Sequence, residues 1–211
     1  MTGILAVWND CVPGVEADYE RWYTQQHLPE RLAVPGFIVG RRYEAHSGDR
    51  RFFSYYEVVD DAVLRSDAYL ARLQNPTEWT QRIMPSFTNA IRTVCTVAQS
   101  SGRMEGGHVV AVRDHGGDGG AKLASLAGSV GARFGVTKVQ LWQAAASQTP
   151  QTAEARTRPT PDGSIHGALV IDCLRLSDAQ DAAADITRTA GGLSVGVFSL
   201  LCTLFAEAPA R

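Results

Sequence analysis

The sequence contains an internal repeat, and this repeat limits the folds open to the chain more than any other feature. The segment GILAVWND, which starts at Gly3, aligns with GHVVAVRD, which starts at Gly107, 104 positions later. Near the other end of each half, VCTV around Cys95 aligns with LCTL around Cys202, 107 positions later. Short apolar segments resemble one another by chance, but two matches with nearly the same separation indicate a duplicated unit.

The predicted elements follow the same order in both halves. Changes of hydrophobic period, with Gly and Pro as breakers, predict β-α-β-β-α-β in residues 1–102 and again in residues 103–211. The first half is expected to have strands at residues 4–9, 37–46, 52–59 and 90–98, and helical segments at 16–32, 62–73 and 78–87. The second half is expected to have strands at residues 108–113, 136–144, 166–174 and 195–205, and helices at 122–134 and 178–189. This is the order of a ferredoxin-like unit, so the fold class is α+β with two tandem units.

The expected strands are apolar on both faces. Adjacent apolar pairs occur at Val7-Trp8, Phe52-Phe53 and Val170-Ile171. Successive strand residues point to opposite faces. Helices cover only one face of a ferredoxin-like sheet, so the other face must be buried against something else.

One helical stretch, residues 16–32, carries the strongest functional signal. Tyr23, His27 and Arg31 are spaced i, i+4 and i+8 and share one helix face. Histidine titrates near neutral pH, so it can accept or donate a proton without a large environmental shift. The pattern predicts a proton-transfer site with an anion-binding neighbour. The alternative is that the aromatic residues are core packing and that the histidine is a surface or satisfied core residue.

The same stretch resembles a known superfamily. The motif WYxxxHxPxR, from Trp22 to Arg31, is followed by VPGF at residues 34–37 and by RRY at residues 41–43. This pattern resembles the dimeric α+β barrel superfamily. It is most similar to members such as the ethyl tert-butyl ether degradation proteins and the methylmuconolactone isomerases, in which a histidine before a proline lies in the active-site cleft. The resemblance implies that two sheets pack into a barrel, here within one chain. Further self-association through strand edges stays open.

The two halves differ in the chemistry that they offer to a cleft. The second-half helix at residues 122–130 has no aromatic residue, histidine or arginine on its core face, so the active site is expected in the first half. On the strand at residues 52–59, Tyr55 with Glu57 is favoured over Tyr56 for the cleft, although Glu57 at the surface and Tyr55 in the core is the alternative. The expected catalytic residues are His27, Tyr23 and Arg31. The expected substrate-binding residues are Trp8, Trp22, Gln26, Tyr43, Tyr55, Glu57 and Trp79.

Several other classes of protein are not expected. A net charge of −2 gives no electrostatic case for nucleic acid or a membrane surface, and the sequence has neither a signal-type segment nor a long apolar run, so we expect a cytoplasmic protein. Phosphate-binding glycine motifs and clusters of metal ligands are also missing, so we expect no cofactor and no metal. The polar stretch at residues 145–163 is expected to be a mobile hairpin loop.

The resemblance implies proton transfer on a small carbonyl-bearing or aromatic substrate, as an isomerase, cyclase or lyase would perform. Three alternatives stay open. The first is a cofactor-free monooxygenase that uses the same residues. The second is a haem-binding enzyme, because some superfamily members with two units per chain bind haem through a second-half histidine, for which His166 is the candidate. The third is a barrel that binds a small molecule without catalysis.

Overall fold

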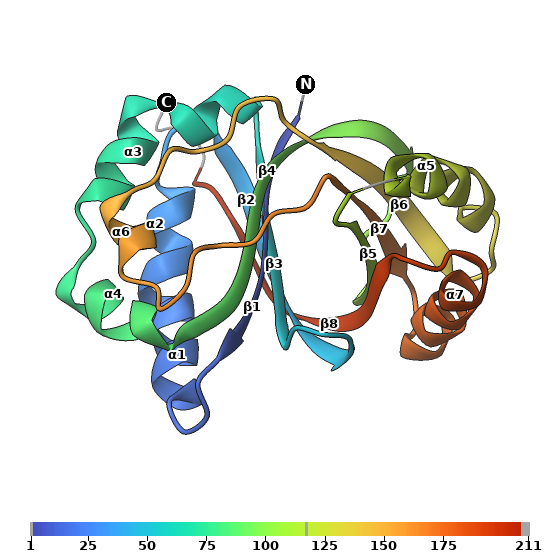
Figure 1. The fold of residues 1–211 in the computed structure, drawn as a ribbon, viewed down its shortest axis with the longest axis horizontal. Coiled ribbons are helices and arrows are strands. Elements are labelled where there is room, and N and C mark those ends of the chain that lie inside the picture. The colour runs from blue at the N-terminus through green and yellow to red at the C-terminus, as the bar shows by residue number, and fades with distance from the viewer. Residues whose placement is uncertain (1, 117, 208–211) are drawn as a thin grey trace.

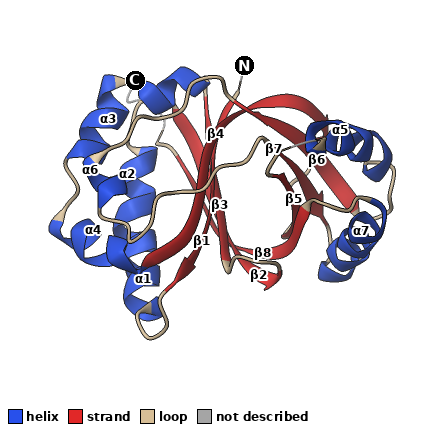
Figure 2. Ribbon diagram, viewed as in Figure 1, coloured by secondary structure: helices blue, strands red, loops and turns tan. Residues whose placement is uncertain are grey.

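The computed structural model describes residues 2–116 and 118–207, and it contains a closed barrel of eight antiparallel strands. Figure 2 shows the barrel between two groups of helices. The strands are β1 (Gly3–Cys11), β2 (Phe37–Ser47), β3 (Phe52–Val58), β4 (Phe87–Gly102), β5 (His108–Asp114), β6 (Val136–Ala144), β7 (Gly167–Cys173) and β8 (Ser194–Phe205). The α-helices are α1 (Glu16–Trp22), α2 (Leu28–Leu32), α3 (Asp67–Gln74), α4 (Glu78–Ile83), α5 (Gly119–Val130), α6 (Ala153–Arg156) and α7 (Leu176–Thr189). None of the described helices is long and apolar enough to span a membrane.

The two halves have the same strand order. The barrel order is β1-β3-β2-β8-β5-β7-β6-β4, so β1 lies between β3 and β4, and β5 lies between β7 and β8. The two four-stranded sheets are joined where β2 pairs with β8 and where β4 pairs with β6. This arrangement confirms the predicted α+β fold with an intramolecular barrel. Each strand has a partner on both sides in this order, which closes the barrel.

Local sequence sets where the first-half helices begin. Ser66 caps α3 by accepting a hydrogen bond from the backbone N–H of Tyr69, and Thr77 caps α4 in the same way with Thr80. Gly36 adopts a positive φ of 96° in the turn before β2, a conformation that other residues rarely adopt. In Figure 1, the helices of the first half lie on one side of the barrel, and α5 and α7 lie on the other.

The strands bury both faces, as predicted, and this creates three apolar layers. One lies between the first-half helices and their sheet, one fills the barrel, and one lies under α5 and α7. On β3, Phe52 and Tyr56 face the helices, whereas Phe53 and Tyr55 face the barrel interior. The expectation that Tyr55 with Glu57 faces the cleft is therefore wrong, since the opposite set of alternating residues lies there.

The segment between β6 and β7, which we call the strap (residues 145–165), corrects a second expectation. Residues 145–163 were expected to form a mobile hairpin loop, but the strap crosses β4 and lies against α3 of the first half (Figure 1). Backbone hydrogen bonds hold Ala145 to Val94 at 2.8 Å and Gly163 to Ala90 at 2.7 Å. Thr152 and Glu154 are buried. The segment has little apolar surface to bury, but hydrogen bonds and an ion pair with the first half hold it in place.

Candidate functional site

A π-helical turn joins α1 to α2 and places the motif residues. The turn covers Tyr23–His27, and the backbone N–H of Leu28 donates to the carbonyl of Tyr23, five residues earlier. Pro29 begins the next turn without a backbone donor. Such turns are rare and occur frequently at functional sites. Tyr23, His27 and Arg31 are all buried and line one cavity, so the structure brings the three predicted catalytic residues together.

The cavity lies between the first-half helices, their sheet and the strap, and its volume is about 30 Å³. That is room for no more than a few water molecules. Its apolar wall is formed by Leu5, Val7, Met84, Phe87 and Ala90. Its polar wall is formed by Tyr23, His27, Arg31, Tyr56, Tyr69, Arg92, Glu154, Arg158 and Asp162.

His27 is a buried, neutral imidazole. Its ring packs against Trp22 and Tyr23, with centroid distances of 4.4 and 4.9 Å. Burial, followed by the positive charge of Arg31, lowers the pKa of His27 well below its ordinary value. Its Nδ1 atom is buried and has no hydrogen-bond partner among the described residues. The imidazole is therefore unprotonated at neutral pH and available as a base.

Arg31 supplies a buried cation beside this base. Its side chain is 2% exposed, and its Nη2 atom donates to Oε1 and Oε2 of Glu154 at 2.6 and 2.5 Å. Glu154 belongs to the strap, 123 positions along the chain. The second terminal nitrogen, Nη1, is buried without a partner in the described part of the chain. The two N–H bonds of Nη1 are thus available to an acceptor.

Two tyrosine hydroxyls complete the polar wall. The hydroxyl oxygens of Tyr23 and Tyr56 lie 3.1 Å apart, and either can be the donor. Burial raises the pKa of both phenols, so they stay protonated at neutral pH. Since one hydroxyl donates to the other, the second hydroxyl proton is available to a ligand oxygen.

Further charged groups form the rim of the cavity. Arg158 donates from Nε and Nη2 to the Asp162 carboxylate, at 2.7 and 2.6 Å. Arg92 donates from Nη2 to the Tyr69 hydroxyl and to Thr149, both at 3.1 Å. No sequence pattern pointed to these residues or to Glu154, and Tyr56 was ranked below Tyr55. The i, i+4 spacing of Glu154, Arg158 and Asp162 was the available signal, but it does not show which part of the fold the strap contacts.

The seven expected substrate-binding residues lie elsewhere than on the cavity wall. Trp22 lies behind His27 and donates from Nε1 to Thr80 at 3.1 Å. Gln26 also bonds Thr80, at 3.1 Å, and Trp79 donates to Asp18 at 3.3 Å. Of the remaining four, Trp8, Tyr43 and Tyr55 pack in the apolar core inside the barrel. Glu57 pairs with Arg41 at 2.9 Å. Strand alternation turns these side chains away from the helices.

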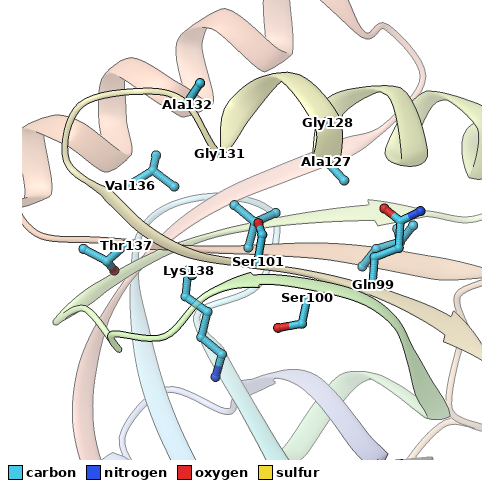
Figure 3. A pocket seen from close by; sticks show the side chains of 13 residues that line it. Gln99, Ser100, Ser101, Ala127, Gly128, Gly131, Ala132, Val136, Thr137 and Lys138 are labelled. Atoms are coloured by element: carbon cyan, nitrogen blue, oxygen red, sulfur yellow. The ribbon is translucent and has the colours of Figure 1, made fainter.

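A larger groove, of about 550 Å³, lies in the second half between α5 and strands β4 and β6. In Figure 3, small residues of α5 face this groove, and the Lys138 side chain points away from α5. Lys138 is the one titratable residue in its lining. This lining lacks the carboxylates, the histidine and the tyrosines of the first-half cavity.

The residues do not fit a haem or a metal ion. His166, the candidate haem ligand, is exposed, and it lines neither the first-half cavity nor the second-half groove. Neither of these linings offers a cysteine, and His27 is their single histidine. Within residues 2–116 and 118–207, no three His, Cys, Asp or Glu side chains are grouped so as to hold a metal.

Solved structures share this fold across nearly the whole chain. An anthrone oxidase-like protein superposes with a TM-score of 0.62 at 9% identity, over 98% of this chain and 94% of that chain. A monooxygenase candidate from Fusobacterium nucleatum gives 0.55 at 10% identity, over 99% of both chains. A chlorite dismutase candidate gives 0.54 at 9% identity, over 95% of both. No protein-family model matches the sequence, and no curated protein matches it. The similarity is one of fold, and it agrees with the α+β barrel that the strands form.

Proposed function

We propose that the first-half cavity is the active site of a cofactor-independent enzyme that transfers a proton on a small carbonyl-bearing or aromatic substrate. The observation that carries the proposal is that His27 and Arg31 line one cavity and that each has a buried atom, Nδ1 and Nη1, without a partner among the described residues. In the tautomer with its proton on Nε2, His27 Nδ1 is a proton acceptor, and Arg31 Nη1 is a cationic donor. The resemblance of the surrounding motif to the ether degradation proteins and methylmuconolactone isomerases supports the same assignment.

In this mechanism His27 takes a proton from the carbon next to a carbonyl group. The negative charge that develops on the carbonyl oxygen is stabilised by Arg31 and by the hydroxyl pair of Tyr23 and Tyr56. A positioned base contributes about 10²–10⁴-fold in rate, and an oxyanion donor in a dry site contributes about 3–4 kcal/mol. Return of the proton to another atom of the substrate completes an isomerisation. Elimination or ring closure of the same anion gives a lyase or cyclase.

Cofactor-free oxygenation is the second candidate. The same base would deprotonate an aromatic substrate, and the resulting anion would react directly with oxygen. The apolar wall that includes Met84 and Phe87 suits an aromatic ring and dioxygen. The anthrone oxidase-like neighbour agrees with this candidate at the level of fold. In both reactions the step assigned to His27 is the removal of a proton.

Proton abstraction is testable before the natural substrate is known. The purified protein is incubated in D₂O with a panel of cyclic ketones, lactones and anthrones, and NMR measures exchange of the acidic C–H protons. We expect catalysed exchange with at least one compound and a loss of about 10²–10⁴-fold in His27→Ala. Oxygen consumption by the same mixtures identifies the oxygenase.

The matched control is His166→Ala, which removes an exposed histidine outside the cavity and should leave exchange unchanged. Equal exchange by wild type and His27→Ala would refute the role of His27. Binding of a panel compound without exchange or oxygen uptake would leave a non-catalytic binding barrel.

A further inference from the structure

The first-half cavity is too small for a substrate as it stands. Small-molecule sites typically have volumes of about 300–1,000 Å³, whereas this cavity has about 30 Å³. A second cavity, of about 330 Å³, is lined mostly by strap residues, with Leu73 and Arg92 from the first half. The two share four wall residues, Arg92, Glu154, Arg158 and Asp162. Movement of this shared wall would join them into one site of ordinary size.

The strap is held differently at its ends and in its middle. At the ends, backbone and side-chain groups bond β4: Ala145 and Gln148 bond Val94, and Gly163 bonds Ala90 and Arg92. The middle carries α6, whose buried Glu154 pairs with Arg31. Thr149 and Ala153 also make neutral hydrogen bonds, with the Leu64 carbonyl and with Gln74, but among the described residues Glu154 on Arg31 is the one ion pair that joins the middle to the first half.

The Arg31–Glu154 pair is asymmetric, and this asymmetry would allow another anion to replace Glu154 on Arg31. Both carboxylate oxygens of Glu154 bind Nη2, and Nη1 is left without a partner among residues 2–116 and 118–207. An incoming anion can bind Nη1 before Glu154 leaves Nη2. The cation then keeps a partner throughout, which avoids the high energy of an unpaired buried charge.

We propose that the ligand of this site is a small organic carboxylate, whose carboxylate group takes the place of Glu154 on Arg31 and so opens the strap. This inference rests on the proposed function in that it concerns the same cavity. Charge supports it, because the cavity is lined by three arginines and two carboxylates, and release of Glu154 leaves three arginines and the single carboxylate of Asp162. A neutral ligand of the same shape cannot compensate Arg31, so it opens the site at a higher cost in free energy.

Benzoate and its neutral isostere benzamide are the probes, and calorimetry measures their dissociation constants. Glu154→Ala removes the competing carboxylate and leaves room for the probe. We expect it to bind benzoate at least tenfold more tightly than wild type, with no such gain for benzamide. Glu154→Gln, which keeps the side-chain size, should show a gain of the same sign, so the test holds if the alanine variant fails to fold.

Two control variants test whether the gain in benzoate affinity comes from Arg31 itself or from any unpaired buried arginine. Arg31→Met with Glu154→Met removes both charges and should not bind benzoate. Glu20→Ala deprives another buried arginine, Arg42, of its carboxylate partner outside the cavity, and it should bind benzoate no more tightly than wild type. Equal affinity of wild type and both Glu154 variants for benzoate would overturn the proposal, as would an equal gain for benzamide.

His27→Ala distinguishes this proposal from the proposed reaction. The variant should still bind benzoate more tightly than benzamide, because His27 is not part of the ion pair. Loss of proton-exchange activity in His27→Ala, with this preference retained, supports both proposals. If benzoate replaces Glu154 on Arg31 but no proton transfer depends on His27, the proposed reaction is refuted and the carboxylate proposal stands.

Discussion

Substitution of Glu154 by alanine should destabilise the fold far more than its place in a polar surface segment indicates. The side chains of Arg31 and Glu154 are 2% and 9% exposed, and Nη2 lies 2.5 Å from Oε2. Removing one partner of such a pair leaves an uncompensated charge in a poorly solvated site. The cost of this is about 3–5 kcal/mol in comparable proteins.

That free energy is measurable as a melting temperature. For a chain of this size, 1 kcal/mol shifts the midpoint by about 2–4 °C, so Glu154→Ala should melt about 6–20 °C below wild type. Circular dichroism and urea titration provide independent estimates. The matched control is Arg188→Ala, which breaks a pair with Asp185 in which Arg188 is 73% exposed. An exposed pair of this kind contributes less than about 1 kcal/mol.

The double variant Arg31→Met with Glu154→Met completes the comparison. Apolar replacement of both partners is often neutral or stabilising, because no buried charge remains. We therefore expect it to melt well above Glu154→Ala. A Glu154→Ala midpoint within a few degrees of the Arg188→Ala midpoint would refute the reasoning, since it would mean that Arg31 is solvated when the carboxylate is gone.

Three further predictions concern titration and the hydroxyl pair. Burial lowers the pKa of His27 in the folded state, so the unfolded chain takes up a proton on this residue first as pH falls. Below about pH 6.5, wild type should therefore lose stability relative to His27→Ala by up to about 1.4 kcal/mol per pH unit, measured by urea titration at several pH values. Burial raises the pKa of Asp172 from 3.8 to about 6, so the charged carboxylate destabilises the folded state as pH rises. Asp172→Asn should therefore stabilise the protein by roughly 2–3 kcal/mol at pH 8, and the gain should shrink toward pH 4. Tyr23→Phe should reduce proton exchange less than His27→Ala does, because Tyr56 retains a hydroxyl in the cavity.

Local patterns in the sequence were enough to predict the element order. The repeat at Gly3 and Gly107 indicated two equivalent strands, and β1 and β5 occupy equivalent places in the barrel. Hydrophobic period and breakers depend on neighbouring residues only, so they can be read without a fold. The spacing of Tyr23, His27 and Arg31 likewise predicted a shared helix face, and all three line one cavity.

Tertiary structure decided which strand face and which distant segment complete the site. Both faces of β3 are apolar and buried, so alternation alone could not distinguish Tyr55 from Tyr56, and only the position of the helices places Tyr56 in the cavity. Glu154 lies in the other half of the chain from Arg31, and its polar surroundings resemble those of a solvated loop. An ion pair between residues so far apart follows from closure of the barrel, which brings the strap across β4, because charge complementarity acts through space and leaves no periodic signal along the chain.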